Sequence, residues 1–347
     1  KKQVANMVES AQSILSETKF ANNMMDMVKL SKCDEGIQLE VAKILSIGET
    51  TSFNRAYIIA KLNLLPDAWS EENKKLREEI MMPRSIMKFE RKRDKLNDIC
   101  MTVSHNEELR RTKKKALFGT NIVSNYTMLP EHSRWFIKYF SNEGDLVCDN
   151  TCGRGTNLLA AAYERRRITG FDLNKNNLDC IREALTDHIG LSEVDFKLFH
   201  SCGVEMVEYA EREEIFDLFI NDIPYILSAE KYNDDPRDLG NIRNLDQFYS
   251  KVEVMMTNMK RLVKKSDYDK GIFKPIIMKV GSQRRGDKGL IDMATDIEMI
   301  ARKIGLTLHD KIFNELRPSM QSYILNTSFQ KKFTMKLSES NLIFLRY

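Results

Sequence analysis

The spacing of hydrophobic and polar residues changes along the chain and divides it into three parts. Near the start, apolar residues recur three and four positions apart, a pattern typical of amphipathic helices. A strongly charged stretch that contains KFERKRDK and RRTKKK follows, with a weaker helical pattern. Beyond it, short apolar runs bounded by turn residues alternate with amphipathic stretches. We predict a helical region over residues 1–82, a basic helical connector over 83–115 and an α/β domain over 116–347.

The third part has the alternation of strand and helix that builds a parallel sheet. Strands are expected over residues 145–149, 168–172, 194–199, 217–222, 273–281 and 341–347. Helices are expected over residues 156–166, 174–185 and 245–265. This alternation predicts a doubly wound, parallel sheet with helices on both faces.

Composition narrows the class of protein only slightly. With 347 residues and 42% hydrophobic content, the chain can build one large domain or two ordinary ones. The net charge of +4 is a weak sign of an anionic partner. No apolar run reaches the length of a membrane span, and no signal-peptide core is visible at the start, so we expect a cytoplasmic protein. The six cysteines form no C-x-x-C pair and the five histidines are scattered, so we expect no metal site.

A glycine turn joins the first strand of the α/β part to its first helix, in the sequence DNTCGRGTNLL (149–159). Gly153 and Gly155 allow a tight turn and a close approach to a ligand. Thr156 is expected to cap the helix, whose N-terminus offers free N–H groups. Asp149 ends one strand and Asp172 the next, and an acidic group about twenty residues beyond the glycines can bind ribose hydroxyls. The set suggests a nucleoside-containing cofactor, and a turn with no ligand is the alternative.

A second cluster, in LFINDIPYIL (218–227), ends a strand expected to lie beside the glycine turn. The Asp222 carboxylate can accept hydrogen bonds from an amine, and Pro224 stiffens the turn. Tyr225 offers a flat face on which a base could stack. The alternative is an ordinary strand end with a capping Asp and a turn Pro.

Taken together, these two clusters resemble the motifs of the amino-group DNA methyltransferases that use S-adenosylmethionine. In that family the glycine motif is D-P-F-x-G-x-G-T and the base-site motif is D/N/S-P-P-Y/F/W, and this chain has DNTCGRGT and DIPY in the same order. The lead-in NYTMLPEHSRW and the closing FTMKLSESNLIFLRY are also similar. The resemblance implies a Rossmann-like methyltransferase sheet, mostly parallel with an antiparallel C-terminal strand. It also implies transfer of a methyl group from S-adenosylmethionine to the N6 amine of a flipped-out adenine in double-stranded DNA.

The resemblance assigns roles to individual residues. Asp172 would bind the ribose of the cofactor, Asp222 and the main-chain carbonyl of Ile223 would hold the target amine, and Tyr225 would stack on the base beside Pro224. The residues expected to surround the cofactor are Asp149, Thr151, Gly153, Gly155, Thr156, Asp172 and Ser201, with Asn125 and Thr127 from the lead-in.

The chain departs from the family pattern at several positions. Asn150 and Thr151 stand where Pro-Phe is usual, and Ile223 replaces the first Pro of the base motif. His200 and Ser201 occupy the place where many members carry an Asp near the adenine. By the resemblance, the leading Asp of the base motif implies adenine-N6 rather than cytosine-N4, because cytosine-N4 members more often carry Ser there. A cytosine-N4 enzyme, an RNA-base methyltransferase and a non-enzymatic DNA-binding regulator on an altered scaffold remain the alternatives.

Two further segments are candidates for DNA contact. Residues 38–62 have the pattern of a helix-turn-helix and resemble the helical DNA-binding part of ParB-like proteins, with a plain helical hairpin as the alternative. The basic segment GSQRRGDKG (281–289) is either a phosphate-binding or a solvated loop. The DNA-contact candidates are Asn54, Arg55, Lys61, Arg284, Arg285 and Lys288. We expect a prokaryotic or phage-encoded protein that associates with the nucleoid through DNA and could belong to a restriction–modification system, with a homodimer as one oligomeric possibility.

Overall fold

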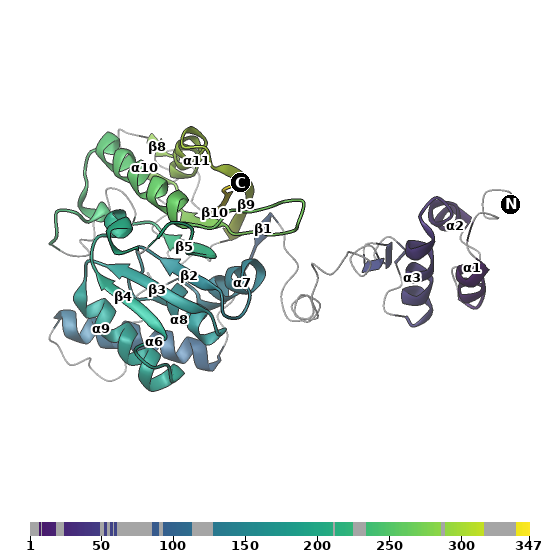
Figure 1. The fold of residues 1–347 in the computed structure, drawn as a ribbon, viewed down its shortest axis with the longest axis horizontal. Helices are drawn as coiled ribbons and strands as arrows, with labels where there is room; N and C mark the ends of the chain where they lie inside the picture. The colour runs from purple at the N-terminus through teal and green to yellow at the C-terminus, as the bar shows by residue number, and fades with distance from the viewer. Residues whose placement is uncertain are drawn as a thin grey trace, which may run out of the picture. The chain divides into compact units, whose positions relative to one another are not determined.

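The computed structural model forms two compact units, Lys1–Glu78 and Glu79–Tyr347, which are described separately (Figure 1). The described residues are 7, 9–18, 24–48, 52, 53, 56, 57, 59, 60, 85–89, 93–112, 128–210, 212–224, 234–285, 289–315 and 338–347. None of the helices in these ranges is long and apolar enough to cross a bilayer.

The described residues of the first unit are mostly helical. Its helices α1 (Glu9–Ser16), α2 (Met24–Leu30) and α3 (Glu35–Ser46) share one small apolar core. Asp34 caps α3 by accepting a hydrogen bond from the Ile37 N–H at 2.9 Å. Gly48 follows α3 with a φ of +76°, so the chain turns where the helix-turn-helix interpretation places its turn. Asn54, Arg55 and Lys61 lie outside the described residues, so their contact with DNA stays a prediction.

The second unit contains a mixed sheet, and the described residues contribute eight strands to it. Its order is β1-β9-β10-β6-β5-β2-β3-β4, and β10 runs antiparallel to both of its neighbours, whereas the other pairs are parallel. This order confirms the expected Rossmann-like methyltransferase sheet with an antiparallel C-terminal strand. The strands are β1 (Ile86–Met87), β2 (Leu146–Asp149), β3 (Arg167–Asp172), β4 (Phe196–His200), β5 (Leu218–Asp222), β6 (Ile276–Val280), β9 (Thr307–Glu315) and β10 (Ser338–Leu345).

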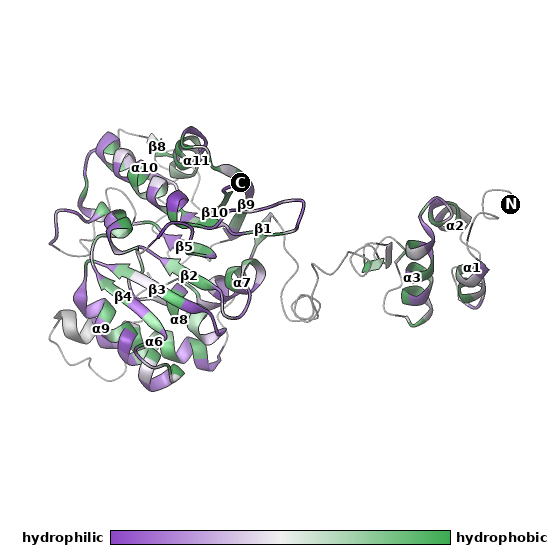
Figure 2. Cartoon of the chain, viewed as in Figure 1, coloured by the Kyte–Doolittle hydropathy of each residue, from purple (hydrophilic) through white to green (hydrophobic). Residues whose placement is uncertain are grey.

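Helices cover both faces of this sheet (Figure 1). One face packs against α6 (Lys95–Thr112), α7 (Pro130–Phe140), α8 (Thr156–Tyr163) and α9 (Lys175–Glu183). The other face packs against α10 (Leu245–Leu262) and α11 (Met293–Lys303). Within β5, Leu218 and Ile220 enter the first core while Phe219 enters the second. The central strands β2 and β5 are therefore largely hydrophobic up to their polar last residues, because both of their faces are buried (Figure 2).

Two segments have structures that differ from those predicted from the sequence. Helix α6 falls within the predicted connector, yet its Leu96, Ile99 and Val103 enter the core shared with α8 and α9. The segment expected as a basic loop contains an antiparallel hairpin, β7 (Gln283–Arg285) with β8 (Gly289–Ile291). The described part of the second unit also contains three short helical segments, η3 (Ala184–Ile189), η4 (Gly203–Tyr209) and η5 (Leu239–Asn241).

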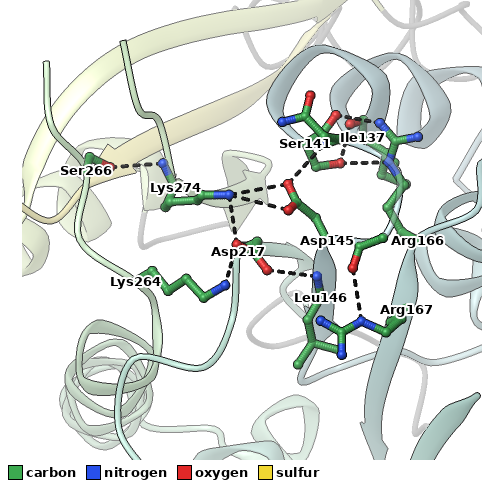
Figure 3. Close-up of polar contacts among 12 residues, drawn as sticks. Ile137, Ser141, Asp145, Leu146, Arg166, Arg167, Asp217, Lys264, Ser266 and Lys274 are labelled. Carbon is green, nitrogen blue, oxygen red and sulfur yellow. Dashed lines mark hydrogen bonds and ion pairs between the residues drawn. The ribbon is translucent and has the colours of Figure 1, made fainter. Parts of the chain in front are cut away.

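An ion cluster ties together the amino ends of three central strands (Figure 3). Asp217, which precedes β5, accepts a hydrogen bond from the N–H of Leu146 on β2 at 2.9 Å. The Nζ atoms of Lys264 and Lys274 each lie 2.7 Å from the Asp217 carboxylate. Lys274 also lies 3.3 Å from Asp145, just before β2. Burial alone would raise the pKa of Asp217, but these hydrogen bonds and charges hold it below its ordinary value.

Replacing Asp217 by Asn is expected to destabilise the second unit by about 3 kcal/mol. This is the lower end for a broken buried ion pair, because Lys264 is partly exposed and Lys274 keeps Asp145 as a partner. Since the pKa of Asp217 is lowered in the folded state, its contribution is present above pH 3.8 and is lost as the pH falls below that value. Urea denaturation at pH 7 measures the change. Glu213→Gln, which removes an exposed ion pair with Arg261, is the control and should cost less than about 1 kcal/mol. Equal losses in both variants would contradict the prediction.

Candidate functional site

Three aspartates come together at the carboxyl edge of the sheet. Asp149, Asp172 and Asp222 end β2, β3 and β5, which are neighbours in the order β5-β2-β3. Asp149 follows Val147 by two positions and Asp222 follows Ile220 by two, and both apolar residues face the α8 side of the sheet. The same alternation places Asp172 on that side. The three carboxylates therefore project from one face at one edge, where the chain switches from winding one way to winding the other.

The glycine turn folds over the end of β3. The N–H of Gly153 donates to Asp172 Oδ2 at 2.7 Å, and the N–H of Thr151 donates to Asp149 Oδ1 at 3.1 Å. Asp172 Oδ1 accepts from the N–H of Asn174 at 2.7 Å. The two strand-end carboxylates thus hold the turn in shape, in addition to the ligand contacts that the sequence suggests for them. Nδ2 of Asn177 also donates to Asp172 Oδ1, at 3.2 Å. A carboxylate has about four acceptor sites, so about one remains on Asp172 for a ribose hydroxyl.

The two glycines of the turn serve different purposes. Gly155 has a φ of +77°, and a Cβ there would lie 2.5 Å from Cγ1 of Ile181 on α9. Gly153 has a φ of +50°, and among the described atoms none lies within 4 Å of its Cβ position. Packing therefore requires Gly155, whereas Gly153 leaves space above the backbone. Thr156 was expected to cap α8, but that prediction is wrong, because Gly155 occupies the N-cap position and Thr156 is the first residue of the helix.

Two of the three carboxylates are hard to ionise. Burial raises the pKa of Asp149 to about 7, although hydrogen bonds from Asn157 and Thr151 lower it, and the charges of Asp222 and Asp172 add to the rise. Burial likewise raises the pKa of Asp172 to about 6. In the part of the chain that the structure describes, neither has a Lys, Arg or His nitrogen within 4.0 Å of its carboxylate. A cationic ligand would supply the missing positive charge.

The base motif is connected to the glycine turn. The Thr151 hydroxyl donates to the main-chain oxygen of Asp222 at 3.4 Å. The Asp222 carboxylate is 33% exposed, and its Oδ2 lies 2.9 Å from Nζ of Lys279 on β6. Pro224 follows at the sheet edge with intermediate exposure. Tyr225 lies outside the described residues, so its stacking role stays a prediction.

Ile223 fills a structural position of its own. Its side chain is buried in the core beneath α10, and its N–H donates to the Lys279 carbonyl at 3.4 Å. The residue therefore extends the pairing of β5 with β6 by one position beyond Asp222. A Pro at this position would lack that N–H donor.

Asn150, the other departure from the family pattern, is part of a buried amide chain. Its Nδ2 donates to the Gly203 carbonyl at 3.1 Å, and its Oδ1 accepts from Nδ2 of Asn221. A Cβ on Gly203 would lie 1.6 Å from the Asn150 carbonyl oxygen. Asn150 thus joins the end of β2 to β5 and to η4.

Several residues of this site were missed by sequence reasoning. Asn157 on α8 donates to Asp149 Oδ2 at 2.8 Å and accepts from the Ser133 hydroxyl at 2.7 Å. Arg154 of the glycine turn is held by Glu107 of α6 at 2.7 Å. Of these missed residues, Lys279 could have been found from the sequence, because it is a single lysine in the otherwise apolar strand IIMKV.

The other predicted site residues divide into described and undescribed ones. Ser201 lies beside the turn, since its N–H donates to the Asp172 carbonyl at 3.1 Å. Nε2 of the exposed His200 lies 3.0 Å from the Leu173 carbonyl. Arg284 and Arg285 belong to β7, and their side chains are not described. Asn125, Thr127 and Lys288 lie outside the described residues.

No protein-family model matches the chain, and no curated protein matches it. Among solved structures, TrmN from Thermus thermophilus is similar at 10% identity and a TM-score of 0.42. The match covers 63% of this chain, and the chain spans about half, 49%, of the length of TrmN. An rRNA methylase from Streptococcus thermophilus matches at 14% identity and a TM-score of 0.40, over 63% of this chain and 98% of its own. TYW2 from M. jannaschii, in complex with AdoMet, matches at 12% identity and a TM-score of 0.38, and the match covers 64% of this chain and 78% of TYW2. Because each TM-score is below 0.5, the fold assignment depends on the strand order of this chain.

The two glycines allow a direct comparison of backbone strain with packing. Gly153→Ala is expected to cost about 1 kcal/mol of stability, since only its left-handed backbone is strained. Gly155→Ala is expected to cost about 2–4 kcal/mol, because a clash with Ile181 is added to the same strain. Urea denaturation of both variants checks this difference. Equal costs would mean that the Ile181 side chain moves aside freely.

The raised pKa of Asp149 has a predictable effect on stability. Between pH 3.8 and about 7 the folded state keeps a proton that the unfolded state has lost, so this group reduces stability as the pH rises through that window. The melting temperature of Asp149→Asn, compared with that of the wild type, should therefore shift in favour of the variant between pH 4 and pH 8. Asp217→Asn should show no such gain above pH 4, because the pKa of Asp217 is lowered. A pH-independent difference for Asp149→Asn would contradict the assignment.

Proposed function

We propose that this protein is an S-adenosylmethionine-dependent methyltransferase that acts on the N6 amine of adenine in DNA. The observation that carries the proposal is the junction of the two motifs, in which the Thr151 hydroxyl contacts the main chain of Asp222 at the switch point of the sheet. A cofactor at the glycine turn and a target amine at Asp222 would then be neighbours. Adjacency of the two reactants is the main requirement of a direct group transfer.

The residues at the turn suit this cofactor. Gly153 leaves open space at the backbone, and Asp149 and Asp172 are carboxylates without a cationic partner among the described residues. Asp172 remains able to accept hydrogen bonds from ribose hydroxyls. When bound, S-adenosylmethionine supplies an electrophilic methyl group on a positively charged sulfonium. That charge complements the two aspartates and favours their ionised forms.

The base motif suits an exocyclic amine. Such an amine is a poor nucleophile, because its lone pair is delocalised into the ring. The Asp222 carboxylate and the Ile223 carbonyl are two acceptors that can draw its N–H bonds out of the ring plane and localise the lone pair. The partial exposure of Asp222 leaves the carboxylate within reach of a substrate. A base inside a duplex cannot reach this edge, so the target would be flipped out.

The departures from the family pattern leave in place the acceptors that the proposed reaction needs. Asn150 is satisfied by Gly203 and Asn221, and Ile223 is packed in the core and hydrogen-bonded to β6. Each replacement therefore has a defined structural place, and the carbonyl at position 223 is retained. DNA is favoured as the substrate by the resemblance of the motifs and by the helical first unit, whose turn at Gly48 suits a helix-turn-helix.

Incubation of the purified protein with methyl-labelled S-adenosylmethionine and duplex DNA tests the proposal. Label should appear as N6-methyladenine, and Asp222→Ala should lower the rate about 100-fold or more, because an acceptor that acts in the transition state is lost. Cofactor affinity, measured by calorimetry, should change little in this variant. Asp269→Ala, in an exposed turn, is the control and should keep the wild-type rate.

Other outcomes would select the alternatives. Label found as N4-methylcytosine would identify a cytosine enzyme, and preferential labelling of RNA in a direct competition would identify an RNA methyltransferase. Cofactor binding without transfer to any nucleic acid would instead indicate a regulatory scaffold.

A further inference from the structure

A buried ion triad lies behind Asp222. Lys279 on β6 is directly opposite Asp222 in the parallel register of β5 and β6. Its Nζ lies 2.9 Å from Asp222 Oδ2 and 3.1 Å from Oε2 of Glu339 on β10. The Lys279 side chain is only 11% exposed and that of Glu339 only 9%. The ammonium group is thus enclosed between two carboxylates, one of which belongs to the amine site.

The charges around this triad keep Lys279 protonated. Burial alone would lower its pKa, but the carboxylates of Asp222 and Glu339 raise it above its ordinary value. His132 of α7 faces the triad as a neutral group, since burial and the charge of Lys279 lower its pKa to about 3. Asp149 and Asp172 lie on the other side of Asp222 and are negative when ionised. Lys279 is therefore a positive charge that offsets part of the negative charge of this edge.

Stability alone does not account for a lysine at this position. The other four residues of β6 are Ile276, Ile277, Met278 and Val280, as expected for a central strand covered on both faces. A buried ion pair is often no more stable than a well-packed apolar replacement, because desolvation of the charges offsets their attraction. Local departures of this kind tend to occur at functional sites.

We propose that Lys279 is a positioning residue for methyl transfer, an inference that rests on the proposed function. Its ammonium group fixes Oδ2 of Asp222 against β6 and keeps the carboxylate ionised beside two other acidic groups. The carboxylate is then held as an acceptor for the N–H of the target amine. Glu339 holds Lys279 from the opposite side, so the orientation of Asp222 is set by three strands.

The amino edge of the same sheet provides a matched control. There Lys264 lies 2.7 Å from the buried Asp217, which precedes β5, whereas Asp222 ends that strand. Both are Lys–Asp pairs, although Lys264 is 39% exposed and Lys279 only 11%, and Asp217 lies away from both motifs. Lys264→Met should therefore lower stability without changing the rate of transfer.

Four variants test the inference: Lys279→Met, Lys279→Arg, the double variant Lys279→Met/Glu339→Gln, and Lys264→Met. The double variant removes one positive and one negative charge together, so it should fold even where Lys279→Met does not. We expect Lys279→Met and the double variant to lower kcat roughly 100-fold, because a misplaced acceptor no longer aligns the amine. The KM for DNA and the cofactor Kd should stay within about threefold. Lys279→Arg should recover much of the lost rate.

The pH–rate profile separates positioning from simple support of the fold. Without the ammonium group the Asp222 carboxylate is easier to protonate, so the acid limb should move to higher pH in the double variant and return in Lys279→Arg. A folded double variant with wild-type kcat and an unmoved acid limb would overturn the inference while the proposed function stands. A wild-type protein that transfers no methyl group would overturn the proposed function itself, so the two failures are distinguishable.

Discussion

The parallel pairing of β2 with β5 is the constraint on which the candidate site depends. The chain winds outward from β2 through β3 and β4, then returns to place β5 on the other side of β2. The turns that follow β2 and β5 therefore open next to each other, although about seventy residues separate them. Polar contacts secure this pair at both ends, through Asp217 and the N–H of Leu146 at the amino edge, and through Thr151 and Asp222 at the carboxyl edge.

The same strand arrangement concentrates acidic side chains at the carboxyl edge of the sheet. Parallel strands that end together bring their terminal side chains together, so acidic residues that are far apart in sequence become neighbours. Burial at this edge raises the pKa values of Asp149 and Asp172, and the charges of the other strand-end aspartates add to the rise only at Asp149. Asp222 is instead paired with a buried ammonium group. The part of the edge at Asp149 and Asp172 would therefore favour a cationic ligand, whereas Asp222 already has Lys279 as its cationic partner. That division matches the two reactants of the proposed transfer.

The sequence predicted the architecture well and the contacts poorly, for identifiable reasons. Strand ends at Asp149, Asp172 and Asp222 follow from apolar runs that stop at a polar residue, a local signal. The capping role of Thr156 was wrong because a left-handed Gly155 takes the cap position. The glycines signal a tight turn, but they do not fix the residue at which the helix begins. The link from Lys279 to Glu339 joins strands sixty positions apart and depends on the register of β10, which no local pattern fixes.

The extra hydrogen bond of Ile223 bears on how the amine site would keep its shape. Where a family member has Pro, the ring restrains the backbone covalently, whatever the state of the neighbouring strand. Here the restraint comes from the ladder between β5 and β6 and from the apolar core beneath it. Such a restraint is cooperative: it persists while the sheet is intact and disappears when the strand end frays. The position of the Ile223 carbonyl therefore depends on the end of β6 staying paired. On heating, local unfolding there would disorder the amine site before the whole domain unfolds.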